Sequence, residues 1–102
     1  MAKSDKALLD LNNPVFQDDL FNLEKGDALR ILETLKKIKS LTWTDVYKDK
    51  GLRWESIQSR IGPGGQRLNS IRISQRFRAL VYREVQFMRF LSLHPDHDSA
   101  YK

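Results

Sequence analysis

The first forty residues contain one short strand pattern followed by two helical patterns. Residues 6–11 alternate partly between polar and apolar side chains, which predicts a first strand. Asn13 before Pro14 predicts a helix start with Asn13 as N-cap, and a break at Gly26-Asp27 separates this helix from a second one. The second helix is expected to bury one apolar stripe, made up of Leu29, Ile31, Leu32, Leu35, Ile38 and Leu41. The short connection predicts an antiparallel helical hairpin.

The second half of the chain is dominated by strand patterns. A capping-box pattern at Thr42–Asp45 predicts a brief helical turn as far as Lys50, and a weaker strand pattern covers 52–57. A flexible loop at 62–65 is followed by three predicted strands, 68–74, 77–84 and 86–93. The last two are expected to form an antiparallel hairpin. Its turn contains Val85 and no glycine, which is unfavourable turn chemistry.

This order of elements predicts an α+β fold for a single domain that covers residues 1–102. The N-terminal strand and the helical hairpin are expected to pack on one face of a mainly antiparallel sheet of three to four strands. The other face is expected to stay open to solvent. Because side chains alternate along a strand, Arg72 should lie on that open face, away from Ile71 and Ile73. Arg78 begins the neighbouring strand.

The positive charge of the chain is confined to its second half. Residues 1–50 carry nine Lys/Arg and nine Asp/Glu, whereas residues 51–102 carry nine Lys/Arg, eight of them Arg, against four acids. The net charge of +5 therefore belongs to the C-terminal half. Arg suits bidentate contacts with phosphates and stacking on bases, so a nucleic-acid partner is one interpretation. An Arg-rich, solvated sheet face explains the charge equally well.

Composition also limits cofactors and location. The chain has no cysteine, which excludes disulfides and thiolate metal sites, and its two histidines make a structural zinc site unfavourable. We expect no metal and no cofactor. No apolar run is long enough for a membrane span, and the polar residues 1–5 do not resemble the start of a signal peptide. A cytoplasmic protein is expected.

Two segments resemble a known protein family. Residues 68–83, with Arg72 on one strand and Phe77-Arg78 opening the next, resemble the central strand pair of RelE/ParE-superfamily toxins, particularly the HigB-like branch. Residues 91–101, in which a strand pattern runs into a His-Asp-x-x-Tyr ending, resemble the C-terminal ending of that family. Two residues depart from the family pattern, because Asn69 replaces a frequent aromatic and Val85 a frequent Gly or Asp.

The resemblance implies the toxin of a type II toxin–antitoxin system, with a RelE-like fold. The implied activity is ribosome-dependent endonucleolytic cleavage of mRNA by 2′-hydroxyl attack, without a metal or cofactor. The implied partners are a cognate antitoxin, the 70S ribosome and mRNA. Two alternatives stay open at this point. One is a ParE-like toxin that inhibits DNA gyrase by binding, and the other is an inactive nucleic-acid-binding module.

The resemblance also implies the residues that would act. The catalytic candidates are Arg72, Arg78, His97, Asp98 and Tyr101, and the nucleic-acid-binding candidates are Arg72, Arg76, Arg78, Arg83 and Arg89. Arginines never deprotonate, so they suit charge stabilisation, whereas His97 suits proton transfer because an ordinary histidine titrates near neutrality. A surface histidine in a tail is the alternative for His97. For His94, which precedes Pro95, a structural role and a functional role are equally supported.

Overall fold

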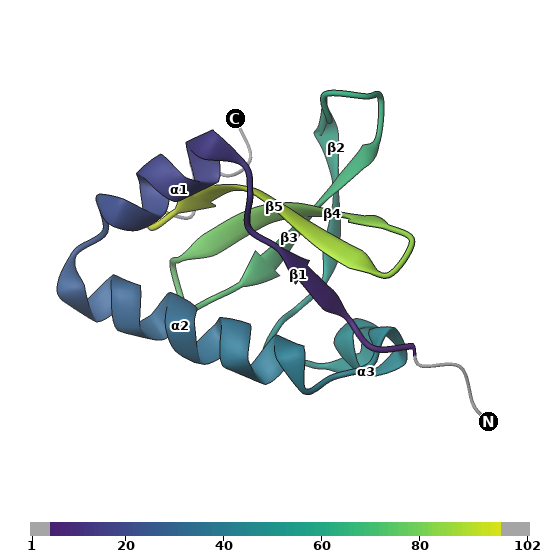
Figure 1. Cartoon of the computed structure of the whole chain (residues 1–102), viewed down its shortest axis with the longest axis horizontal. Helices are drawn as coiled ribbons and strands as arrows, with labels where there is room; N and C mark the ends of the chain where they lie inside the picture. Colours follow the sequence, from purple (N-terminus) through teal and green to yellow (C-terminus); the bar gives the residue numbers. More distant parts are fainter. Residues whose placement is uncertain (1–4, 97–102) are drawn as a thin grey trace.

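The chain forms a five-stranded sheet and three helices (Figure 1). The computed structural model describes residues 5–96. The elements in chain order are β1 (Leu8–Asp10), α1 (Pro14–Phe21), α2 (Lys25–Lys39), α3 (Trp43–Lys48), β2 (Glu55–Ile61), β3 (Arg67–Arg72), β4 (Arg78–Glu84) and β5 (Phe87–His94). The α+β prediction is confirmed, and the sheet has more strands than the three to four expected.

The strands lie in the order β1-β5-β4-β3-β2. Strands β2 to β5 pair antiparallel in chain order, and β1 pairs with β5 in parallel, so the first and last strands of the described chain are neighbours. The weak strand pattern at 52–57 is displaced toward the C-terminus, because β2 covers Glu55–Ile61. Both edge strands therefore join the sheet, which accounts for the higher strand count.

Side-chain caps set the starts of α1 and α3 where the sequence predicted them. The Asn13 side chain accepts hydrogen bonds from the backbone N–H groups of Val15 and Phe16, at 2.8 and 3.2 Å. At α3 the Thr42 hydroxyl accepts from the backbone N–H of Asp45, and the Asp45 carboxylate accepts from that of Thr42. These bonds satisfy amides that have no partner within the helix, which explains why each helix begins there.

The start and the buried face of α2 differ from the prediction. The helix begins at Lys25, so it already includes Gly26 and Asp27. Its core side chains are Ile31, Leu35 and Ile38, whereas Leu29 and Leu32 are 55% and 51% exposed. A helix turns by about 100° per residue, so Leu29 points away from the side on which Ile31, Leu35 and Ile38 align. The sheet covers only that side, and the predicted stripe was therefore too wide.

The main core lies between the sheet and the helices α1 and α2. Figure 1 shows these two helices joined at one end and lying against the same side of the sheet. Phe16 of α1 packs on Phe90 of β5 with ring centres 5.4 Å apart, and Ala79 and Val81 of β4 are fully buried beneath the helices. Within residues 5–96, no helix has the length and apolar character needed to cross a membrane.

The opposite face of the sheet, which we call the distal face, is less open than expected. The residues of β4 that alternate with Ala79 and Val81 point to this side. Leu80 belongs to a second apolar cluster there, which consists of Ile57, Leu68, Leu80, Tyr82 and Leu91. The expectation of a fully solvated face is thus wrong over its middle, and polar side chains lie on either side of this apolar cluster.

The β4–β5 turn holds Val85 in an unfavourable backbone conformation. Val85 and Gln86 form the turn, and Val85 has φ = 57°. Hairpins with a positive φ at the first turn residue normally carry glycine, asparagine or aspartate there. Arg83 Nε donates to the Val85 carbonyl at 2.7 Å, and the Gln86 carbonyl accepts from Trp43 Nε1 and from the Leu8 amide, both at 2.9 Å. Contacts with β4 itself and with two other segments, α3 and β1, therefore keep this strained turn in place.

Replacing Val85 with glycine should stabilise the protein. A β-branched residue in this region costs about 1–2 kcal/mol, and the greater freedom of glycine in the unfolded chain offsets part of the relief. The Val85 side chain is 78% exposed, so little packing is lost. We expect Val85→Gly to raise the free energy of unfolding by roughly 0.5–1 kcal/mol in urea denaturation. Val85→Ala, which keeps Cβ, is the matched control and should recover less. A Val85→Gly protein no more stable than the wild type would contradict strain at this turn.

Candidate nucleic-acid interface

One row of side chains crosses three strands at the end of the distal face. Arg72 of β3 pairs with Arg78 of β4, and Arg78 pairs with His94 of β5. Directly paired residues point to the same face, and Arg78 alternates with Ala79, which faces the helices. The three residues therefore form one row, here called the Arg72–Arg78–His94 row. Neighbouring strands lie about 4.8 Å apart, so the backbone positions of the row span roughly 10 Å from Arg72 to His94.

Arg78 is the buried member of the row. It is only 6% exposed, and its Nη1 lies within hydrogen-bond distance of the carbonyl oxygens of Ser74, Gln75 and Phe77, at 2.8, 3.1 and 3.3 Å. These carbonyls belong to the loop that joins β3 to β4. A charged donor shared among carbonyls stabilises that loop and offsets the cost of burying the guanidinium. Within residues 5–96, its Nε and Nη2 have no such partner.

Arg72 is the half-buried cation next to it. Its backbone amide donates to the Leu52 carbonyl at 2.6 Å, which fixes the strand end. Within the described part of the chain, its guanidinium has no hydrogen bond or ion pair. Two like charges directly opposite each other on neighbouring strands repel. An anion between Arg72 and Arg78 would remove this repulsion, which makes the pair a suitable anion site.

His94 completes the row, and its ring is held by a neighbouring hydroxyl. Its Nε2 lies 2.8 Å from Ser92 Oγ, two residues earlier on the same strand. Burial lowers the pKa of His94 below its ordinary value of 6.5, the Asp19 carboxylate opposes this shift and the Arg60 guanidinium reinforces it. His94 is therefore uncharged at neutral pH and able to accept a proton.

The other arginines predicted to bind nucleic acid lie elsewhere. Arg76 is exposed in the β3–β4 loop. Arg83 pairs with Met88, a residue of the main core, and so lies on the side of the helices. Its Cζ lies 4.4 Å from the ring centre of Trp43, and it donates to the Tyr47 hydroxyl at 2.8 Å. Arg83 thus connects α3 to the β4–β5 hairpin and is not part of the Arg72–Arg78–His94 row.

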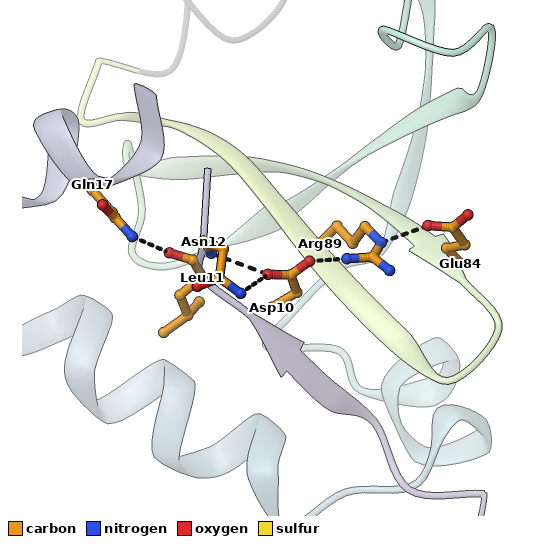
Figure 2. A network of polar contacts seen from close by, with 6 residues as sticks. All are labelled: Asp10, Leu11, Asn12, Gln17, Glu84 and Arg89. Carbon is orange, nitrogen blue, oxygen red and sulfur yellow. Dashed lines mark hydrogen bonds and ion pairs between the residues drawn. The ribbon is translucent and has the colours of Figure 1, made fainter. Parts of the chain in front are cut away.

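Arg89 lies on the distal face but is neutralised within the chain. Figure 2 shows its guanidinium between the carboxylates of Asp10 and Glu84, with both contacts drawn. The Nε–Glu84 contact is 2.6 Å, and Nη1 pairs with Asp10. The same Asp10 accepts from the backbone and side-chain amides of Asn12. Arg89 therefore links β1, β4 and β5, which leaves it less charge for an outside partner.

The predicted C-terminal candidates His97, Asp98 and Tyr101 lie outside the described residues.

Asn69, which stands where the resembled family often has an aromatic residue, faces the helices. Its Nδ2 donates to the Glu55 carbonyl at 3.2 Å, and it pairs with buried Val81, so it does not point to the distal face. In residues 5–96, no three His, Cys, Asp or Glu side chains are close enough together to hold a metal ion.

Sequence reasoning did not identify Arg60, and it left His94 undecided. His94 enters the row because β5 contains a register shift opposite Leu80 and Val81. Val81 pairs with Phe90 but Leu80 pairs with Ser92, so Leu91 is an extra residue in the strand. Without that bulge, strict alternation from Phe90 would place His94 on the helix side of the sheet, away from Arg72 and Arg78. The sequence did offer one signal: the polar residues Ser92 and His94 alternate with Leu91 and Leu93 at the end of the strand pattern, so they are expected to share a face.

The shift in the pKa of His94 is directly testable. We expect its imidazole to titrate below pH 6.5 in an NMR titration, with its resonance identified by its loss in His94→Gln. Arg60→Gln should raise this pKa and Asp19→Asn should lower it further. Because the folded pKa is the lower one, the contribution of His94 to stability is complete above pH 6.5 and is lost as the pH falls below it. A pKa at or above 6.5 would mean that burial does not govern this ring.

No protein-family model matches the chain, and no curated protein matches it by sequence. Solved structures do match. A chain of the archaeal RelE–RelB complex from Pyrococcus horikoshii superposes with a TM-score of 0.56 at 17% identity, over 91% of this chain and 96% of that one. A copper-bound mutant toxin from Helicobacter pylori matches with a TM-score of 0.49 at 16% identity, over 92% and 96% of the two chains. The first of these likenesses, with the sheet order and helical layer described above, shows that the chain has a RelE-like fold.

Proposed function

We propose that the chain is the toxin of a type II toxin–antitoxin system and cleaves mRNA on the ribosome. The observation that carries this proposal is the Arg72–Arg78–His94 row, in which two guanidinium groups and an uncharged imidazole share one end of a sheet face. The RelE-like fold supports the toxin assignment. The HigB-like branch, and a single toxin domain over residues 1–102, remain parts of the proposal.

The proposed reaction divides between charge and proton transfer. The 2′-hydroxyl of a nucleotide attacks the adjacent phosphorus and the bond to the 5′-oxygen breaks, which leaves a 2′,3′-cyclic phosphate and a 5′-hydroxyl. One group must take the proton from the 2′-oxygen and another must donate one to the leaving oxygen. Arg72 binds the phosphate and stabilises the charge that grows on it in the transition state. Arg78 adds its charge and holds the loop beside the phosphate.

His94 and His97 are proposed to share the two proton transfers. His94 is placed on the row with its pKa lowered, so its neutral form can act as the base. His97 follows it by three residues in the chain, and it is proposed to donate the proton to the leaving 5′-oxygen. Asp98 is proposed to orient His97, and Tyr101 to donate a hydrogen bond or to stack on a base.

The proposed partners follow from the charge of the row. Outside a complex, the arginines would bind nucleic acid indiscriminately, so we propose an acidic antitoxin segment that covers the row until the toxin is released. The ribosome and its bound mRNA are the proposed target. Action on the ribosome requires a cytoplasmic protein.

Removing either histidine should slow cleavage far more than it weakens binding. Proton-transfer groups act on the barrier, and their loss costs about two to four orders of magnitude in rate. We expect His94→Ala and His97→Ala to show such losses in single-turnover cleavage of mRNA on programmed ribosomes at saturating protein, with the binding isotherm nearly unchanged. His94→Gln, which keeps a hydrogen-bonding group near Ser92 but cannot titrate, is the matched variant and should fail nearly as badly.

Three results would change this assignment. If only His97→Ala is slow, the role of His94 is structural. If both alanine variants cleave within a few-fold of the wild type, proton transfer by histidine is wrong. If the wild-type protein yields no new mRNA 5′ ends in cells but inhibits gyrase, the ParE-like alternative holds, and inertness in both assays indicates a binding module.

Removing Arg72 should make ribosome or RNA binding less sensitive to salt. Each phosphate contact with a single strand contributes roughly −0.7 to the slope of log K against log salt concentration. We expect Arg72→Ala to make the slope shallower by about one such contact while the fold is retained. Arg30→Ala is the matched control, because Arg30 is an exposed arginine of α2 on the helix side. An equal effect of both substitutions would place Arg72 outside the binding surface.

A further inference from the structure

A cavity of about 360 Å³ lies on the distal face beside the Arg72–Arg78–His94 row. Its floor consists of Leu68, Leu80 and Leu91, which belong to the apolar cluster of that face. Its walls come from the start of α1 and from residues 60–63, where β2 ends and the chain turns back to β3. Figure 1 shows this β2–β3 hairpin projecting beyond the rest of the sheet. The volume is at the lower end of the range of small-molecule sites.

The cavity exposes apolar side chains that the fold itself does not use. Val15 of α1 is 57% exposed and Ile61 of β2 is 74% exposed, although both line a hollow with an apolar floor. Exposed apolar groups around a concave surface indicate a site for a ligand with an apolar surface of its own. A flat ring placed here would contact aliphatic carbon on its faces.

The rim of the cavity is polar and positively charged. Asn13 uses its side-chain oxygen to cap α1, and its Nδ2 has no partner within residues 5–96, so it remains available as a donor. Ser92 contributes a hydroxyl and Arg60 a guanidinium. Hydrogen-bonding groups at the edge and an Arg plane beside an apolar floor match a nucleobase, which has polar edges and flat faces.

The cavity lies close to the row along the same two strands. Leu80 in the floor is two residues from Arg78 on β4, and Ser92 on the rim is two residues from His94 on β5. Two residues of strand span about 7 Å, which is comparable to the distance between a phosphate and the base of the same nucleotide. Ser92 belongs to both features, because its hydroxyl contacts His94 and also lines the cavity. A phosphate on the row would thus place its own base over the cavity.

We propose that this cavity holds one nucleobase of a single-stranded nucleic acid whose phosphate lies on the Arg72–Arg78–His94 row. The inference rests on the function proposed above and adds to it a binding site for the base. The arginines of the row attract any nucleic acid, whereas the cavity requires an unpaired base that has left its stack. The site therefore selects single strands over duplexes and fixes the position of the bound phosphate.

The test compares two probes that carry the same number of phosphates. One is a short fluorescent oligothymidylate and the other is an abasic deoxyribose oligomer of equal length. Neither has a 2′-hydroxyl, so neither can be cleaved by the proposed reaction. We expect Ile61→Ser to weaken oligothymidylate binding about fivefold to tenfold, the lower range for loss of one stacked base, and to leave abasic binding unchanged. Arg72→Ala should weaken binding of both probes.

Phe21→Ser is the matched control, because Phe21 is 78% exposed and does not line the cavity. It should change neither affinity. If the wild-type protein binds both probes equally and Ile61→Ser affects neither, the base site is wrong while nucleic-acid binding stands. If neither probe binds the wild type at low salt, the base site fails together with nucleic-acid binding. Weaker binding of both probes by Ile61→Ser would mean that Ile61 supports the hairpin rather than a base.

Discussion

The register of β4 is the constraint on which the other features depend. This strand lies between β3 and β5 and pairs with both, with Ala79 and Val81 under the helices and Arg78 and Leu80 on the distal face. A slip of one residue would exchange the two faces. The Arg78 guanidinium would then enter an apolar core, at a cost of several kcal/mol that no other contact offsets. Correct packing of the core and assembly of the Arg72–Arg78–His94 row are therefore a single event.

The arginines of the second half serve two different purposes. Arg53, Arg83 and Arg89 form ion pairs with Glu55, Asp5 and, for Arg89, both Asp10 and Glu84. Arg78 is bound by loop carbonyls. Much of the positive charge counted from composition is thus used to connect strands, helices and loops. The charge left for a partner is therefore smaller than the count suggests, and it includes Arg72, which makes no ion pair within the described residues.

Local signals predicted the fold well, whereas pairings between distant residues did not follow from them. The caps at Asn13 and Thr42 and the three C-terminal strands depend on neighbouring residues, so short patterns identify them. The buried face of α2 depends on where the sheet lies, and Leu29 and Leu32 fit a stripe equally well by spacing alone. The place of His94 depends on an extra residue in β5, which no sequence pattern predicts. Arg60 joins this region only because β2 extends to Ile61.

The parallel pairing of β1 with β5 affects how the protein is made. Asp10 and Arg89 are separated by 79 positions in the chain yet lie on adjacent strands. During synthesis, β1 has no neighbouring strand to pair with until β5 has been translated and has left the ribosomal exit tunnel. The strand that carries His94 is also the one that completes the sheet between β1 and β4. A growing chain therefore cannot assemble the row before β5 has emerged and paired with β4.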